Sequence, residues 1–136
     1  MHEVFEHTAD LGLRVTAPSL DALLAEAAAG LFEIIAGDLA QIRPRVARSF
    51  AIDGTDPVYL LLDWLGDLHA AFEIDQLLFC EFAVAVHEQG LTATARGEPY
   101  DPTVHRLAHE IKAITQHELD VHQTPTGWEA TLIVDI

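Results

Sequence analysis

The residues best suited to bind a ligand lie near the two ends of the sequence. Asp135 directly precedes the last residue, Ile136, in the stretch "GWEATLIVDI", and Asp10 directly precedes the alternating stretch "LGLRVTA". Side chains alternate between the two faces of a strand, so strand parity separates both aspartates from the more apolar face. Both carboxylates are therefore expected at strand ends, outside the most apolar surface.

The expected strand pairing brings these carboxylates together. A short turn in the last hairpin places Asp135 opposite residues 113–115 of the preceding strand and close to Lys112. If the first and last strands also pair antiparallel, the start of one meets the end of the other. Asp10, Asp135, Lys112 and the Ile136 carboxylate would then cluster at one end of a sheet.

Such a cluster predicts either a cation site or two solvated strand ends. Neighbouring carboxylates repel one another unless a cation lies between them. Ligand sets made only of oxygen favour calcium, magnesium or manganese. The alternative is that Asp10 and Asp135 simply face water. Lys112, the only lysine of the chain, could be a counter-charge, or it could contact a phosphate or an acidic group of a partner.

Other reactive residue types do not form a recognisable site. His105 and His109 are four residues apart and would share a helical face, but the zinc-protease pattern and cysteine pairs are absent. Cys80 lies in an apolar stretch, and no glycine-rich phosphate loop or nucleophile motif occurs. Asp63 is interpreted as a solvated helix position. We therefore expect neither a zinc site nor a catalytic nucleophile.

The charge of the chain limits the classes of partner. It carries 22 acidic against 7 basic residues, a formal net charge of −15, which disfavours nucleic-acid binding across a broad surface. It favours divalent cations or a basic protein partner. A single cysteine fits a reducing compartment, and we expect neither a signal peptide nor a membrane span. The sequence thus predicts a cytoplasmic protein.

The pattern of apolar residues predicts one α+β domain over residues 1–136. The expected elements are a strand at 11–17, a helix between a Ser19 cap and Gly37, a strand at 46–53, a helix from Asp56-Pro57 through Phe72, two hairpins at 79–97 and 114–136, and a short helix beginning at Asp101-Pro102. Together they form a mostly antiparallel sheet on which the two amphipathic helices pack.

Four stretches resemble the archease family. They are "FEHTADLGLRV", "LLDWLGDLHAAFEIDQLLFCEF", "GEPYDPTVHRLAHEIKAITQH" and "GWEATLIVDI", and they occur in that family's order and spacing over nearly the whole chain. The H-T-A-D motif, the I-K-A-[IV]-T block and the terminal D-I are specific in combination.

The resemblance implies a small α+β protein that activates an RtcB-type RNA ligase in tRNA splicing and RNA repair, by promoting guanylylation of the ligase and multiple turnover. It also implies a cation site, most typically for calcium, at Asp10, Asp135 and Ile136, and a functional lysine at Lys112. Two further functions remain open: a chaperone-like interaction module for tRNA-processing enzymes, and a metal-dependent hydrolase that uses the carboxylates.

Overall fold

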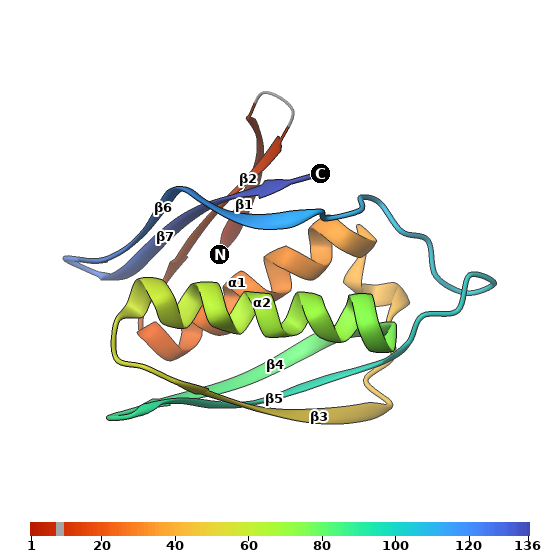
Figure 1. Cartoon of the computed structure of the whole chain (residues 1–136), viewed down its shortest axis with the longest axis horizontal. Helices are drawn as coiled ribbons and strands as arrows, with labels where there is room; N and C mark the ends of the chain where they lie inside the picture. Colours follow the sequence, from red (N-terminus) through yellow and green to blue (C-terminus); the bar gives the residue numbers. More distant parts are fainter. Residues whose placement is uncertain (8–9) are drawn as a thin grey trace.

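The computed structural model describes residues 1–7 and 10–136, with only the backbone for His7. Two helices lie between two antiparallel sheets (Figure 1). In chain order the elements are β1 (His2–His7), β2 (Asp10–Ala17), α1 (Leu20–Ala36), the 3-10 helix η1 (Leu39–Gln41), β3 (Val46–Asp53), α2 (Pro57–Asp75), β4 (Leu77–His87), β5 (Gly90–Pro99), β6 (Ala113–Thr124) and β7 (Gly127–Asp135). This arrangement confirms the expected α+β class and both hairpins.

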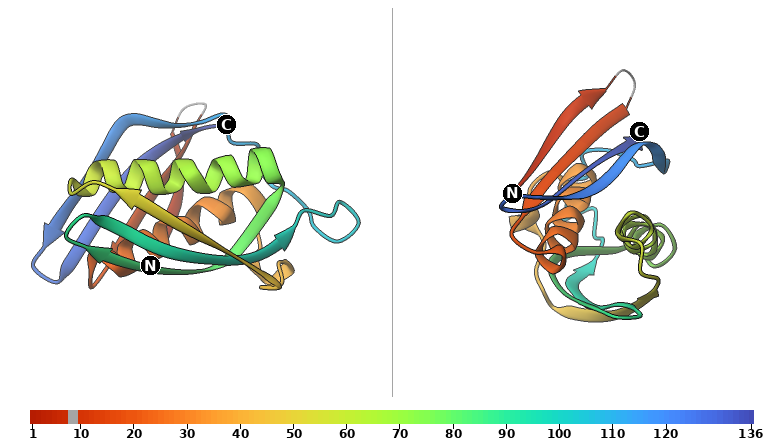
Figure 2. Two further views of the ribbon diagram at one scale, coloured as in Figure 1. Left: turned by 60° about the horizontal axis from the view of Figure 1, so that its bottom comes forward. Right: turned by 90° about the vertical axis from the view of Figure 1, so that its left-hand side faces the viewer.

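The strands divide into two sheets, which the sequence did not reveal. One sheet has four strands in the order β1-β2-β7-β6, and the other has three in the order β3-β5-β4. All pairings are antiparallel. The end-on view in Figure 2 shows the helices between the sheets. β7, which carries Asp135, is an inner strand and pairs with β2 on one side and β6 on the other.

Side-chain caps begin both helices where the sequence predicts. Ser19 Oγ accepts a hydrogen bond from Ala22 N–H at 3.1 Å before α1, and Asp56 Oδ1 accepts one from Val58 N–H at 2.9 Å before α2. Gly37 ends α1 with a φ of 80°, a conformation that glycine adopts without strain. No helix in the described part of the chain is long and apolar enough to cross a membrane.

Aromatic side chains join the helices to the three-stranded sheet. Trp64 of α2 is fully buried, and its Nε1–H donates to the carbonyl oxygen of Leu24 in α1 at 2.9 Å. Its ring meets Phe50 of β3 edge to face, with ring centroids 5.4 Å apart. Phe32 of α1 meets Phe79 of β4 in the same way at 5.5 Å. The helices are therefore fixed against one sheet while they support the other.

Residues 100–112 contain no helix, which corrects the short helix expected from Asp101-Pro102. Thr103 N–H donates to Asp101 Oδ1 at 2.9 Å in a tight turn, and the chain then runs irregularly to β6. Val104 and Leu107 are 58% and 41% exposed, so the apolar spacing does not mark a buried helical side. Hydrogen bonds to other elements occupy backbone groups that a helix would have used.

β1 is an edge strand that the sequence analysis did not identify. Phe5 pairs with Gly12 of β2, and the Phe5 ring lies directly over this glycine. A Cβ atom at Gly12 would lie 2.1 Å from Phe5 Cζ, so the close approach requires glycine. The few apolar residues of β1 are interrupted by histidine and glutamate, so the sequence shows no clear alternation of apolar and polar residues there.

Candidate functional site

Asp10 and Asp135 occupy directly opposite positions on the neighbouring strands β2 and β7. Opposite residues of an antiparallel pair have Cα atoms about 4.5–5.5 Å apart. Both residues stand at strand ends and are half-buried. The register confirms that the strand at the start of the chain pairs with the last strand and that the two aspartates meet there.

Lys112 reaches the same end of the sheet from the other side of β7. Ala113, the first residue of β6, pairs with Asp135, and the Lys112 N–H donates to the Asp135 carbonyl oxygen at 2.8 Å. This confirms the expected position of Asp135 opposite the start of the preceding strand. The Lys112 side chain is exposed. Three segments distant in sequence thus converge on one strand end.

The two aspartates lie on the face of the four-stranded sheet that points away from the helices. Leu11 and Leu13 are buried in the core, and Asp10 and Gly12 have the opposite parity along β2. Gly12 pairs with Ile133, which is fully buried although it shares the parity of Asp135. Phe5, Gly12 and Ile133 form a cross-strand row beside the aspartates.

The charges of this strand end are not balanced within the described part of the chain. Neither Asp10 nor Asp135 forms an ion pair there, and Lys112 forms none either. Like charges directly opposite one another destabilise a pair of strands. A bound cation or a basic group of a partner would remove this repulsion.

The donor atoms fit a hard cation, but the side chains alone do not complete a site. Among the residues that the structure describes, no group of three or more His, Cys, Asp or Glu side chains could hold a metal ion. Asp10 and Asp135 supply two carboxylates, so further ligands must be a terminal carboxylate, backbone carbonyls or water. Calcium accepts such mixed oxygen sets.

His105 and His109 do not lie together on a helix, which corrects the geometry considered for them. His105 is 3% exposed, and its Nδ1 accepts a hydrogen bond from Asp101 N–H at 2.9 Å. Its Nε2 bonds to the buried Glu98 carboxylate at 2.8 Å. A hydrogen bond from the Arg43 N–H, followed by the bond to His105, lowers the Glu98 pKa. This buried pair fixes the turn after β5.

The remaining candidates behave as structural groups. Burial, with the charges of Glu81 and Glu98, raises the pKa of the Cys80 thiol, so the thiolate is disfavoured and Cys80 is not an activated nucleophile. Asp63 is an exposed residue of α2, as expected. Burial and the Asp63 charge raise the pKa of Asp67, one turn later on the helix. None of these positions adds a reactive group to the candidate site.

The Archease protein family matches residues 2–136. An archease of Methanopyrus kandleri is 41% identical to the chain over 138 residues, covering 98% of both proteins. An archease of Methanosarcina acetivorans is 35% identical over 140 residues, covering 99% of this chain and 95% of that protein. The H-T-A-D motif falls partly on Thr8 and Ala9, which lie outside the described residues.

Two solved structures share the fold. The solution structure of protein 1598 of Methanobacterium thermoautotrophicum has a TM-score of 0.80 and 29% identity, and the match covers 99% of this chain and 98% of that one. The crystal structure of an archease of Thermotoga maritima, named a possible chaperone, has a TM-score of 0.64 and 20% identity, with 100% and 98% covered. The second likeness concerns the fold alone.

Proposed function

The chain belongs to the archease family, and we propose that it is a non-catalytic activator of an RtcB-type RNA ligase, working through the strand end that carries Asp10, Asp135 and Lys112. In this role it promotes guanylylation and multiple turnover of the ligase during tRNA splicing and RNA repair. The ligase supplies the covalent chemistry, and this chain supplies charge and orientation.

The observation that carries the proposal is the register of β7 with its two neighbours. Asp135 lies opposite Asp10 on one side and Ala113 on the other, and its carbonyl oxygen accepts the Lys112 N–H. Two carboxylates are therefore held at one strand end by backbone pairing, and the only lysine is tied to the same end by a backbone hydrogen bond. Backbone pairing fixes positions more closely than flexible side-chain contacts do.

We assign a divalent cation, most suitably calcium, to Asp10 and Asp135, with the carboxylate of Ile136 as the third protein ligand. A bound cation would remove the repulsion between the facing aspartates and could coordinate phosphate oxygens. Lengthening the chain by one glycine after Ile136 keeps every side chain and moves the terminal carboxylate. We expect both that change and Asp10→Asn to weaken cation binding.

The net charge of the chain supports association with a basic partner surface. At −15, long-range attraction would speed the encounter with an enzyme whose RNA channel is basic. Raising the ionic strength from about 0.1 M to about 1 M shortens the screening length from about 10 Å to about 3 Å. We therefore expect the stimulation of the ligase to fall as salt is added.

The direct test is multiple-turnover RNA ligation by an RtcB-type ligase with GTP and manganese, with and without this protein. Wild type should stimulate turnover, and Asp135→Asn and Lys112→Ala should not. Asp53→Asn and Arg96→Ala are matched controls, because both residues are exposed on the three-stranded sheet. Equal stimulation by all five proteins would refute the assigned surface, and no stimulation by wild type would refute the function.

A second candidate is a chaperone-like module, which the description of the Thermotoga maritima relative favours. Such a module would bind several RNA-processing enzymes with similar affinity. Asp135→Asn would also leave its affinity for these enzymes unchanged, since general chaperones recognise exposed apolar surface rather than one charged strand end. Pull-down of several such enzymes with wild type and Asp135→Asn separates the two functions.

A further inference from the structure

Residues 100–112 connect β5 to β6 without regular structure (Figure 1). Hydrogen bonds from other elements nevertheless hold this segment along its length. Tyr100 N–H donates to the carbonyl oxygen of Gln76 at 2.7 Å. Farther along, Ala108 N–H donates to the carbonyl oxygen of Ile35 at 2.7 Å. Hydrogen bonds to neighbouring helices and their ends therefore determine the path of this segment.

Gln41 holds the middle of the segment through both ends of its amide group. Its Oε1 accepts the Arg106 N–H at 2.8 Å, and its Nε2 donates to the Arg106 carbonyl oxygen at 2.9 Å. The same Nε2 donates to the carbonyl oxygen of Ala36 at 2.7 Å. The side chain therefore imitates a strand pairing and ties the segment to the end of α1.

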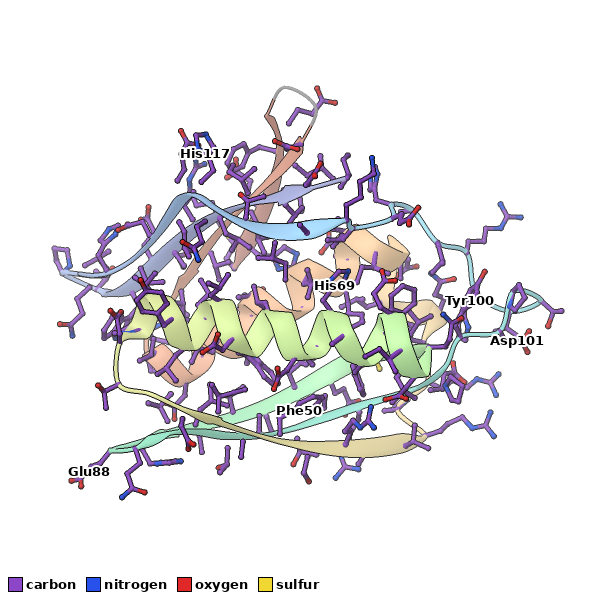
Figure 3. All side chains as sticks on the ribbon, in the orientation of Figure 1. Phe50, His69, Glu88, Tyr100, Asp101 and His117 are labelled. Carbon is purple, nitrogen blue, oxygen red and sulfur yellow. The ribbon has the colours of Figure 1, made fainter. Side chains whose placement is uncertain are left out.

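The peptide group that leads into Lys112 is held from both sides. The Ile111 carbonyl oxygen accepts a hydrogen bond from His69 Nε2 at 2.9 Å, and the Lys112 N–H donates to Asp135. The Ile111 side chain is 3% exposed and packs in the core. In Figure 3 His69 lies between α2 and the four-stranded sheet. Its Nε2 also lies 3.2 Å from Glu73 Oε1 one turn along the helix.

We propose that His69 is a positioning residue for Lys112. The lysine side chain is long and flexible, so its reach is defined only where its backbone is fixed. The bond to Asp135 fixes one side of the peptide plane, and the His69 bond fixes the other. Without the His69 donor, a carbonyl beside the core is left without its partner, which favours rotation of this peptide away from Asp135.

The first test uses the protein alone and compares His69→Leu, which removes the donor, with His69→Gln, whose amide nitrogen can replace Nε2. The readout is hydrogen exchange of the Lys112 amide, measured by NMR. Loss of one hydrogen bond should accelerate exchange about 3- to 10-fold in His69→Leu. His69→Gln should restore slow exchange. Unchanged exchange in His69→Leu, with the protein folded, overturns the proposal.

The second test depends on the proposed function and compares His69→Leu with His69→Gln in ligase stimulation. We expect His69→Leu to lower the stimulation about 3- to 10-fold, and His69→Gln, which keeps a donor, to retain it. Full stimulation by His69→Leu, or an equal loss in His69→Gln, would overturn the proposal. If wild type does not stimulate the ligase, the proposed function fails, while amide exchange still decides the role of His69.

Discussion

Replacing Asp10 by asparagine should change the stability of the protein in opposite directions with and without a divalent cation. Asp10 and Asp135 face each other across β2 and β7, and neither has an ion-pair partner within the described residues. Asparagine keeps the shape of the side chain and removes one of the facing charges. Without a cation, the change should therefore stabilise the fold.

The spacing of the strands sets the size of the effect. Two unit charges about 5 Å apart repel by about 0.8 kcal/mol in water and about 3 kcal/mol near a protein surface. Both aspartates are half-buried, and pairwise effects across strands are about 1 kcal/mol or less. We expect a gain of about 1 kcal/mol, which raises Tm by about 3–5 °C for a chain of this length.

A bound cation should make the wild type more stable than Asp10→Asn. At a calcium concentration of about 100 times its Kd, binding stabilises the wild type by about 2.7 kcal/mol. Asp10→Asn loses most of this contribution and keeps its gain of about 1 kcal/mol, so it should become about 1.5 kcal/mol less stable than the wild type.

Thermal unfolding followed by circular dichroism, in EDTA and in excess calcium, measures both differences. Asp53→Asn removes one exposed carboxylate at a distant strand end and corrects for the lower net charge. Relative to that control, a lower Tm of Asp10→Asn in EDTA would contradict the repulsion. Equal gains of wild type and Asp10→Asn in calcium would contradict the cation site.

Two further predictions concern β1. Burial lowers the pKa of His2, but hydrogen bonds and charges from Glu26 and Glu33 outweigh burial and raise the pKa above its usual value of about 6.5. The stability that this contact adds is therefore complete below about pH 6.5 and is lost as pH rises through the folded-state pKa. His2→Gln should accordingly lower Tm at pH 5.5 and have much less effect at pH 9, as thermal unfolding at both values would show. Gly12→Ala should destabilise the fold by about 1–3 kcal/mol, because its Cβ would overlap the Phe5 ring. In denaturant unfolding, a Phe5→Ala background should remove most of that cost, and an equal cost in both backgrounds would contradict the steric cause.

The sequence predicted the helices and hairpins because local residues determine them. Ser19 caps the N-terminus of α1 and Asp56 caps that of α2. Gly37 ends α1 because glycine adopts a positive φ without strain. Strand parity and a short turn were also sufficient to place Asp135 opposite the start of β6. These features depend on spacing within a few residues, which a single sequence displays directly.

Contacts between distant residues explain what the sequence did not predict. β1 depends on a phenylalanine seated over Gly12, and neither residue signals the other in the sequence. The segment 100–112 carries an apolar spacing typical of a helix, but bonds to Gln41 and His69 determine its path. The division into two sheets likewise depends on which strands, distant in sequence, pair with one another. The local spacing of apolar residues carries no such information.

The candidate site combines two ways of fixing a side chain. Asp10 and Asp135 are placed by strand pairing in the middle of a sheet, where β7 is bound on both sides and a shift of register would displace the whole strand. Lys112 arrives from an irregular segment, so its position depends on a few individual hydrogen bonds. Single substitutions at His69 should consequently alter the lysine while leaving the aspartate pair intact. Cation binding by His69→Leu should match that of wild type although ligase stimulation falls. A parallel fall of both would show that the strand end and the segment move as one unit.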